Sequence, residues 1–180
     1  DPTTNVLVKW DQWVFFFAIV FSTSLLIVER DRGTLAWSLS KPLSRRALLA
    51  GKWVGAMAVY VPFGIVLPMA VCTAVATVAY GTPDIGRIAL AAVLLAGIPA
   101  FFIALTLSLA TVLPSQSAVG GMAVLVAIVP GIVGTIAPDI AMALPPSIGS
   151  WATIVALGGP APMTTLVGWA IGFAVVAAAG

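Results

Sequence analysis

The sequence predicts an all-α integral membrane protein, a polytopic helical bundle, and three observations lead to this fold class. Of the 180 residues, 61% are hydrophobic and 8% are charged, and the mean hydropathy is +1.15. A soluble domain of this size carries far more charge on its surface. The apolar residues form stretches that approach or exceed the roughly 20 residues needed to cross a bilayer. Finally, eight of the fourteen charged residues lie between Glu29 and Lys52.

The residue inventory argues against several kinds of chemistry in this chain. There is no His and a single Cys, Cys72, so we expect neither a Cys/His metal site nor an internal disulfide. The sequence has no paired carboxylates, no HExxH motif and no Gly-x-x-x-x-Gly-Lys-Ser/Thr phosphate loop. We therefore expect no catalytic residue, no metal and no cofactor in the chain itself. The net charge of +2 comes from a local basic excess, which gives no reason to expect a nucleic-acid partner.

The first predicted span covers residues 13–28, with Trp10 and Trp13 at its start. Tryptophan suits the headgroup boundary, where the apolar ring is buried while its N–H remains hydrated. The residues before it lack the pattern of a signal peptide, and the chain begins without Met. We expect that residues precede Asp1, and that they include a whole span.

The charged window, residues 29–52, is predicted to lie on the cytoplasmic side. Six of its eight charged residues are basic, and Lys and Arg are retained on that side during insertion. The pattern predicts one short helix over residues 34–40, ended by Pro42. Ser44 is expected to cap a second helix that starts at Arg45 and continues through Lys52 into the membrane.

Arg45 and Arg46 are unfavourable in the first turn of a helix, because the N-terminal end of the helix dipole is positive. This suggests that they contact something outside the chain, either lipid headgroups or an acidic surface of a partner. The plainer alternative is that the window only sets the topology of the membrane spans. Its ordered arrangement of paired charges, a Pro stop and a Ser cap favours a binding role.

Four more spans are predicted after the window, at residues 53–80, 88–112, 118–136 and 163–180. Pro62 and Pro68 are expected to kink the first of these, and Gly97 and Pro99 to interrupt the second. The turn at residues 81–87 is placed outside. The proline-rich but apolar segment 137–162 is predicted to form broken outer helices that re-enter the membrane, which requires protein or a water-filled cavity around them. The five spans place the C-terminus inside.

Small and polar residues within the spans point to contacts between helices. The pairs Gly51/Gly55 and Gly168/Gly172 have the spacing that lets helix backbones approach closely. Thr106, Ser108 and Thr111 in the third span either line a pathway or bond to their own helix backbone, which is the commoner fate. No charged residue lies deep within a span, which weakens the case for an ion-coupled carrier.

The charged window resembles the permease subunit of ABC transporters of the ABC-2 type. That family shows a Glu-Arg or Glu-x-x-x-Gly-Thr-Leu stretch after its second span, then Leu-x-x-Pro-Leu-Ser-Arg, and a Gly-Lys pair at the start of its third span. The matching runs here are Glu29-Arg30-x-x-Gly33-Thr34-Leu35, Leu39-Ser40-Lys41-Pro42-Leu43-Ser44-Arg45 and Gly51-Lys52. The short turn at residues 115–117 and the broken segment before the last span add an architectural likeness.

The resemblance implies a domain of six spans, of which five are seen here, with a cytoplasmic coupling helix in the window. That helix would dock on a separate ATP-binding cassette subunit, which would hold ATP and Mg. Two permease chains, identical or different, would pair across a substrate pathway, with the broken segment as its outer gate. The residues implied in the contact with the ATPase are Glu29, Arg30, Arg32, Gly33, Thr34, Leu35, Lys41, Pro42, Ser44, Arg45 and Arg46.

The implied function is export driven by ATP across the plasma (inner) membrane, in a bacterium or archaeon. The alternative is a membrane anchor or assembly factor that recruits a cytoplasmic protein through the same window without transport. A secondary carrier or channel is a further alternative. The apolar interior weakly favours a hydrophobic or amphipathic cargo.

Overall fold

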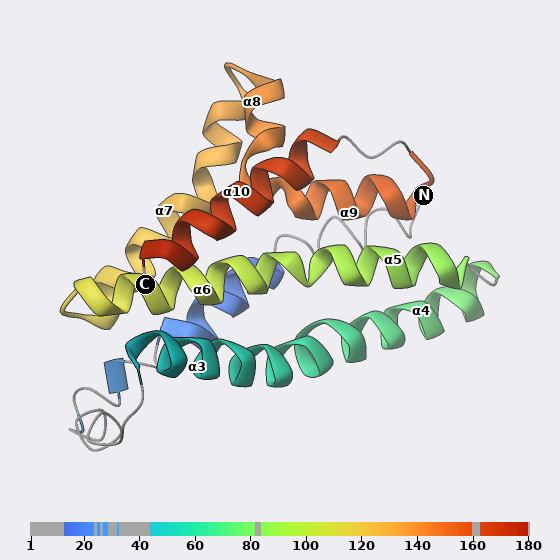
Figure 1. Ribbon diagram of the computed structural model, residues 1–180. Coiled ribbons are helices and arrows are strands. Elements are labelled where there is room, and N and C mark those ends of the chain that lie inside the picture. The colour runs from blue at the N-terminus through green and yellow to red at the C-terminus, as the bar shows by residue number, and fades with distance from the viewer. Residues whose placement is uncertain are drawn as a thin grey trace.

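The computed structural model describes residues 13–23, 25, 27–28, 32, 44–81, 84–159 and 163–179, and every regular element within them is helical. The first helix is described over residues 13–23, 25 and 27–28. It lies behind the long rods formed by α3 to α6 (Figure 1). The observed architecture confirms the predicted all-α fold class.

The second rod is continuous from α3 (Arg45–Tyr60) through a π-helix (Val61–Val66) to α4 (Leu67–Tyr80). Pro62 and Pro68 explain the π segment. A proline has no N–H, and its ring displaces the carbonyl four residues earlier. The backbone adapts by bonding five residues back, as Leu67 N–H does to Pro62 O. The kink predicted at these prolines is therefore accommodated as a local widening of the helix.

The third rod consists of α5 (Ile85–Leu95) and α6 (Gly97–Val112), separated by a turn residue at Ala96. The predicted interruption at Gly97 and Pro99 thus falls at the junction, with Pro99 in the first turn of α6, where its missing N–H costs little. α6 contributes more buried residues than any other described helix. It is the centre of the bundle, and Phe102 and Ile103 are fully buried there.

The rest of the chain surrounds this centre. α7 (Gln116–Gly134) passes through Pro130 without a break. α8 (Pro138–Ala143) folds back on it, followed by a 3₁₀ turn (Pro145–Ser147) and α9 (Ile148–Ala156). α9 lies beside α5, and α10 (Met163–Ala179) crosses α6 (Figure 1). The segment predicted to be broken at residues 137–162 is broken as expected over its described part, at its prolines.

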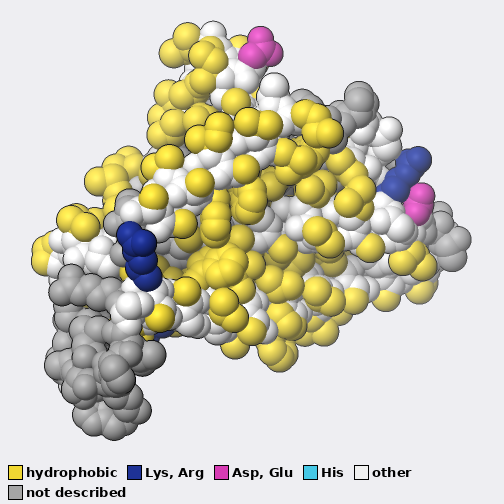
Figure 2. Space-filling model, in the orientation of Figure 1, with side chains coloured by type: hydrophobic (Ala, Val, Ile, Leu, Met, Phe, Trp, Pro, Cys, Tyr) yellow, Lys and Arg dark blue, Asp and Glu magenta, His cyan; other side chains and the backbone are white. Residues whose placement is uncertain are grey.

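Three of the described helices are long and apolar enough to cross a membrane, over Arg46–Ala79, Ile85–Val112 and Gln116–Gly134. The helices at Trp13–Thr23 and Met163–Ala178 are apolar but shorter. Much of the face shown in Figure 2 is hydrophobic or uncharged, and the charged side chains lie towards its edges. This distribution is typical of a surface covered by lipid.

Candidate functional site

The predicted contact residues lie only partly within the described chain. Glu29, Arg30, Gly33, Thr34, Leu35, Lys41 and Pro42 lie outside the described residues, as does the helix predicted over residues 34–40. Arg32 follows the first helix in a turn, and its backbone N–H donates to Val28 O at 3.1 Å. Ser44, Arg45 and Arg46 lie at the start of α3.

Ser44 caps α3 as the sequence predicts. Its backbone is extended, and its hydroxyl accepts a hydrogen bond from Ala47 N–H at 3.2 Å. This satisfies one of the N–H groups that a helix leaves free in its first turn. The first turn of α3 contains no acidic residue, and Arg46 is exposed. The positive charge of Arg46 therefore adds to the positive N-terminal end of the dipole of α3.

Lys52 joins α3 to the first helix at the base of the window. Its Nζ donates to Leu25 O at 3.2 Å, towards the C-terminal side of the described part of the first helix. That side is the negative end of the helix dipole and favours a cation. The Gly-Lys pair noted in the sequence thus has a structural role that connects the two helices on either side of the window.

Two further polar contacts hold the same end of the first helix. Thr106 Oγ1 of α6 donates to Ser22 Oγ at 2.7 Å and also lies 2.9 Å from Phe102 O and 3.0 Å from Ile103 O of its own helix, as predicted. Ser22 Oγ in turn donates to Ala18 O at 2.6 Å. Both hydroxyls are buried, with exposed fractions of 0% and 2%. At the start of α7, Gln116 Nε2 donates to Thr23 Oγ1 at 3.4 Å. The end that leads into the window is therefore bonded to α3, α6 and α7.

Sequence reasoning missed most of this polar layer. The sequence points to Thr106 but not to its partner Ser22, because 84 residues separate the two. It likewise does not pair Gln116 with Thr23, which lie 93 residues apart. A sequence signal was available, since hydroxyls near the end of an apolar span need partners in a membrane. Of the other two polar residues, Thr111 bonds to its own helix at Ser108 O, while Ser108 reaches Val176 O of α10 at 3.1 Å.

A second charged site, at Arg87, lies towards the far end of the α5–α6 rod, 19 residues and about 29 Å of helix from Thr106. Asp84 caps α5 by accepting from Arg87 N–H, and its carboxylate also pairs with Arg87 Nε at 3.3 Å. The guanidinium lies against Gly158, which follows α9 and has a positive φ of 80°. Arg87 thus covers the end of α9, where a cation is favourable.

The broken segment is held by close backbone contact with α10. A Cβ placed on Gly168 would overlap Ala143 O, and one on Gly172 would overlap the ring of Pro145. Gly168 and Gly172 therefore pack as their spacing predicts, although against the connection between α8 and the 3₁₀ turn. Apart from the backbone of α3 itself, no described atom lies within 4 Å of a Cβ built on Gly51 or Gly55, so this pair faces open space among the described residues.

Chemically, this arrangement suits mechanical connection between helices. Within the described residues, no three His, Cys, Asp or Glu side chains come together as a metal site. The structure combines a polar layer at one end, a charged cap at the other, and apolar helices between them.

The comparisons with known proteins agree with this architecture. The chain matches the family described as ABC-2 family transporter protein over residues 13–155. No curated protein and no solved structure matches it. The match includes the charged window, the polar layer at its base and most of the broken segment. The chain therefore belongs to the ABC-2 family of transporter proteins and is a multi-pass membrane protein.

Proposed function

We propose that this chain is the permease subunit of an ATP-driven exporter, coupling a separate ATP-binding subunit to movement of a substrate across the plasma membrane. The observation that carries the proposal is the bonding of the first helix, immediately before the window, to α3, α6 and α7. A force applied to the window by a docked subunit reaches three helices directly. A loop that served topology alone needs none of these contacts.

In this proposal, Glu29, Arg30, Arg32, Gly33, Thr34 and Leu35 contact the ATP-binding subunit, and Lys41, Pro42, Ser44, Arg45 and Arg46 flank that contact. ATP and Mg bind to the partner, and this chain supplies no catalytic group. Two permease chains pair across the pathway. The broken segment from α8 to α9, held by α10 at Gly168 and Gly172, forms the outer gate. Membership in the ABC-2 family supports this assignment of parts.

The coupling role is tested with the double variant Glu29→Ala/Arg32→Ala in the full-length protein, reconstituted with its ATP-binding subunit. Removing charged contacts from the centre of an interface weakens binding on the order of tenfold or more. We expect stimulation of the ATPase to be lost while membrane insertion is normal.

The control is Asp84→Ala/Arg87→Ala, which removes the same two kinds of charge at the far end of the bundle and should leave stimulation intact. Normal stimulation in the Glu29/Arg32 variant would contradict the coupling role. Purification of the full-length protein without any ATP-binding subunit, under conditions that preserve other membrane complexes, would instead favour the anchor or assembly role.

A further inference from the structure

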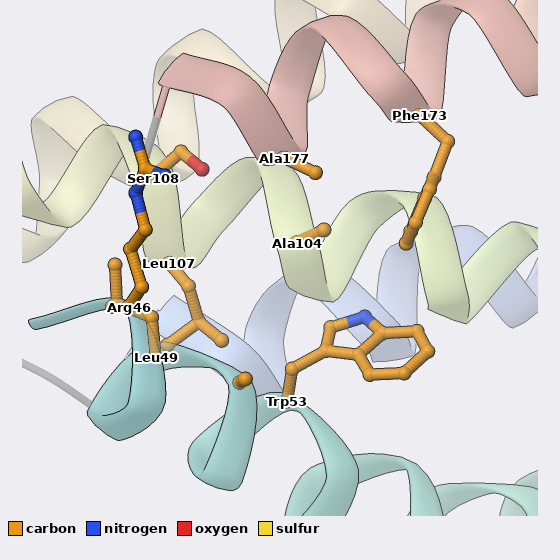
Figure 3. Close-up of a pocket in the computed structure, with 9 residues that line it drawn as sticks. Arg46, Leu49, Trp53, Ala104, Leu107, Ser108, Phe173 and Ala177 are labelled. Carbon is orange, nitrogen blue, oxygen red and sulfur yellow. The ribbon is translucent and has the colours of Figure 1, made fainter. Parts of the chain in front are cut away.

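A cavity of about 370 Å³ opens between α3, α6 and α10 (Figure 3). Nearly all of its lining is apolar. The lining residues are Arg46, Leu49, Ala50, Trp53, Ala104, Leu107, Ser108, Phe173 and Ala177. Ser108 already donates to Val176 O, and Trp53 Nε1 donates to Ala100 O at 2.9 Å. The inner wall therefore presents no polar group that requires a polar ligand.

The cavity exists because alanines stand where the three helices would otherwise interlock. Ala50, Ala104 and Ala177 come from α3, α6 and α10 respectively and leave space between the backbones. At the inner end, the rings of Trp53 and Phe173 meet with centroids 5.7 Å apart. The result is an apolar slot with aromatic rings at one end (Figure 3).

Arg46 stands at the other end of the slot, beside Ser108 (Figure 3). Its side chain is exposed, and it forms no ion pair with any residue that the structure describes. It also lies in the first turn of α3, where an anion is favoured by the helix dipole. From Arg46 to Trp53 the helix rises about 10 Å over seven residues.

The position of Arg46 relative to the membrane decides what kind of anion fits. Arg46 lies at one end of the helix Arg46–Ala79, which is long and apolar enough to cross a membrane, and basic residues at the end of such a helix reach towards the lipid headgroups. An apolar slot leading from a cation at this level into the membrane matches a molecule with an anionic head and an apolar chain. Free phosphate gains no binding energy from the apolar wall, and an acidic protein surface has no apolar chain that could fill the slot.

We propose that this cavity binds one anionic phospholipid, with its phosphate on Arg46 and one acyl chain running along α3 to Trp53 and Phe173. The lipid fills the space that the alanines leave and joins α3 to α10. This site shares Arg46 with the residues that flank the proposed contact for the ATP-binding subunit, but the rest of its lining lies outside that contact. It stands whether or not the chain is coupled to ATP hydrolysis.

The test is native mass spectrometry of the full-length protein, delipidated in mild detergent and then offered phosphatidylglycerol or phosphatidylcholine with identical acyl chains. Both lipids carry the phosphate, but phosphatidylcholine also places its choline cation near Arg46, and like charges placed together cost binding energy. We therefore expect one phosphatidylglycerol to be retained about tenfold in preference, or about 1.4 kcal/mol. Arg46→Gln should abolish this preference. Arg87→Gln, which removes an equal charge at the other end of the bundle, should leave it unchanged.

Filling the slot tests the chain-binding part separately. Ala50→Leu lies on an exposed part of α3 and should fold normally, as checked by thermal unfolding, yet lose retention of both lipids. Ala104→Leu should do the same from α6. Equal retention of both lipids by the wild type would overturn the proposal, as would an undiminished preference in Arg46→Gln.

Two other results would assign Arg46 elsewhere and overturn the proposal as well. If inorganic phosphate alone raised the unfolding temperature of the wild type and phosphatidylglycerol did not, the site would hold a free anion. If Arg46→Gln lost a soluble protein partner with lipid retention unchanged, Arg46 would belong to a protein interface.

Discussion

Thr106 illustrates how single side chains determine packing in an apolar interior. Its hydroxyl is fully buried and bonds to Ser22 of the first helix. Within a membrane, no water is available to bond a hydroxyl that lacks a partner in the protein. The contact therefore fixes the first helix against α6 more specifically than apolar packing alone, since lipid competes equally for apolar surfaces.

Replacing Thr106 with Val removes this hydroxyl at nearly constant volume. We expect a loss of about 0.6–1.7 kcal/mol, the range found for hydrogen bonds between membrane helices. Thermal or denaturant unfolding in mild detergent measures it. Thr77→Val is the matched control, because Thr77 bonds only to carbonyls of its own helix, at Thr73 and Ala74. Equal losses in the two variants would show that the contact with Ser22 contributes nothing.

Predictability at this scale depends on the distance along the chain. The cap at Ser44 was predictable because donor and acceptor are three residues apart. The hydrogen bond from Lys52 to Leu25 spans 27 residues, and nothing in the sequence indicates that these two residues pair. All residues of the predicted ATPase contact, both those that the structure describes and those outside it, remain predictions.

Among the elements, α10 has the tightest contact. Gly168 lies against the main chain at Ala143, and Thr165 Oγ1 nearby donates to Met142 O at 2.7 Å. A side chain can move aside, but a carbonyl fixed in a packed connection cannot do so cheaply. The position of the broken segment thus depends on the absence of a side chain at Gly168.

We expect Gly168→Ala to destabilise the protein by about 1–3 kcal/mol, the usual cost of overfilling a packed site. Gly55→Ala, also in a helix with the same spacing motif, meets no atom within 4 Å and should stabilise by up to about 1 kcal/mol through helix propensity. The unfolding of both variants in detergent measures these two changes in stability. A neutral Gly168→Ala would contradict the contact, and a destabilising Gly55→Ala would indicate that another chain covers that face.

The limits of the elements were more predictable than their packing. Ser44, Asp84 and Ser115 cap helices in the structure, and prolines mark the breaks before α8 and the 3₁₀ turn. These are local effects of the backbone. The packing of α9 along α5 could not be predicted from the sequence. Both helices are apolar, and the spacing of their residues does not indicate which helix each one contacts.

For the whole molecule, charge separates the two ends of the bundle. Among the described residues, one end carries Arg46 and Lys52 at the start of α3, and the other carries Asp84 and Arg87. We expect the membrane to lie between them, and the basic excess of the window predicts that its side faces the cytoplasm.

Moving Lys41, Arg45 and Arg46 into the turn at residues 81–87 should therefore invert or mix the orientation, because the excess of basic residues would then lie at the other end. Labelling with an impermeant maleimide checks this, using single cysteines at Ser115 and Asp84 in a Cys72→Ala background. Replacing the same three basic residues with Gln, without adding any elsewhere, is the control. Unchanged labelling after the transfer would contradict the inside and outside assignment.

The π-helix between α3 and α4 has a consequence for how this rod tolerates length changes. A turn that bonds five residues back holds one residue more than an α turn, so the extra residue is taken up within the turn. The side of the rod that packs at Ala56 and Tyr60 and the side that packs at Met69 therefore keep nearly the relative rotation of a regular helix. A one-residue deletion within Val61–Val66 would restore regular winding and leave α4 facing nearly as before, whereas the same deletion within α4 would rotate the remainder of that helix by about 100°.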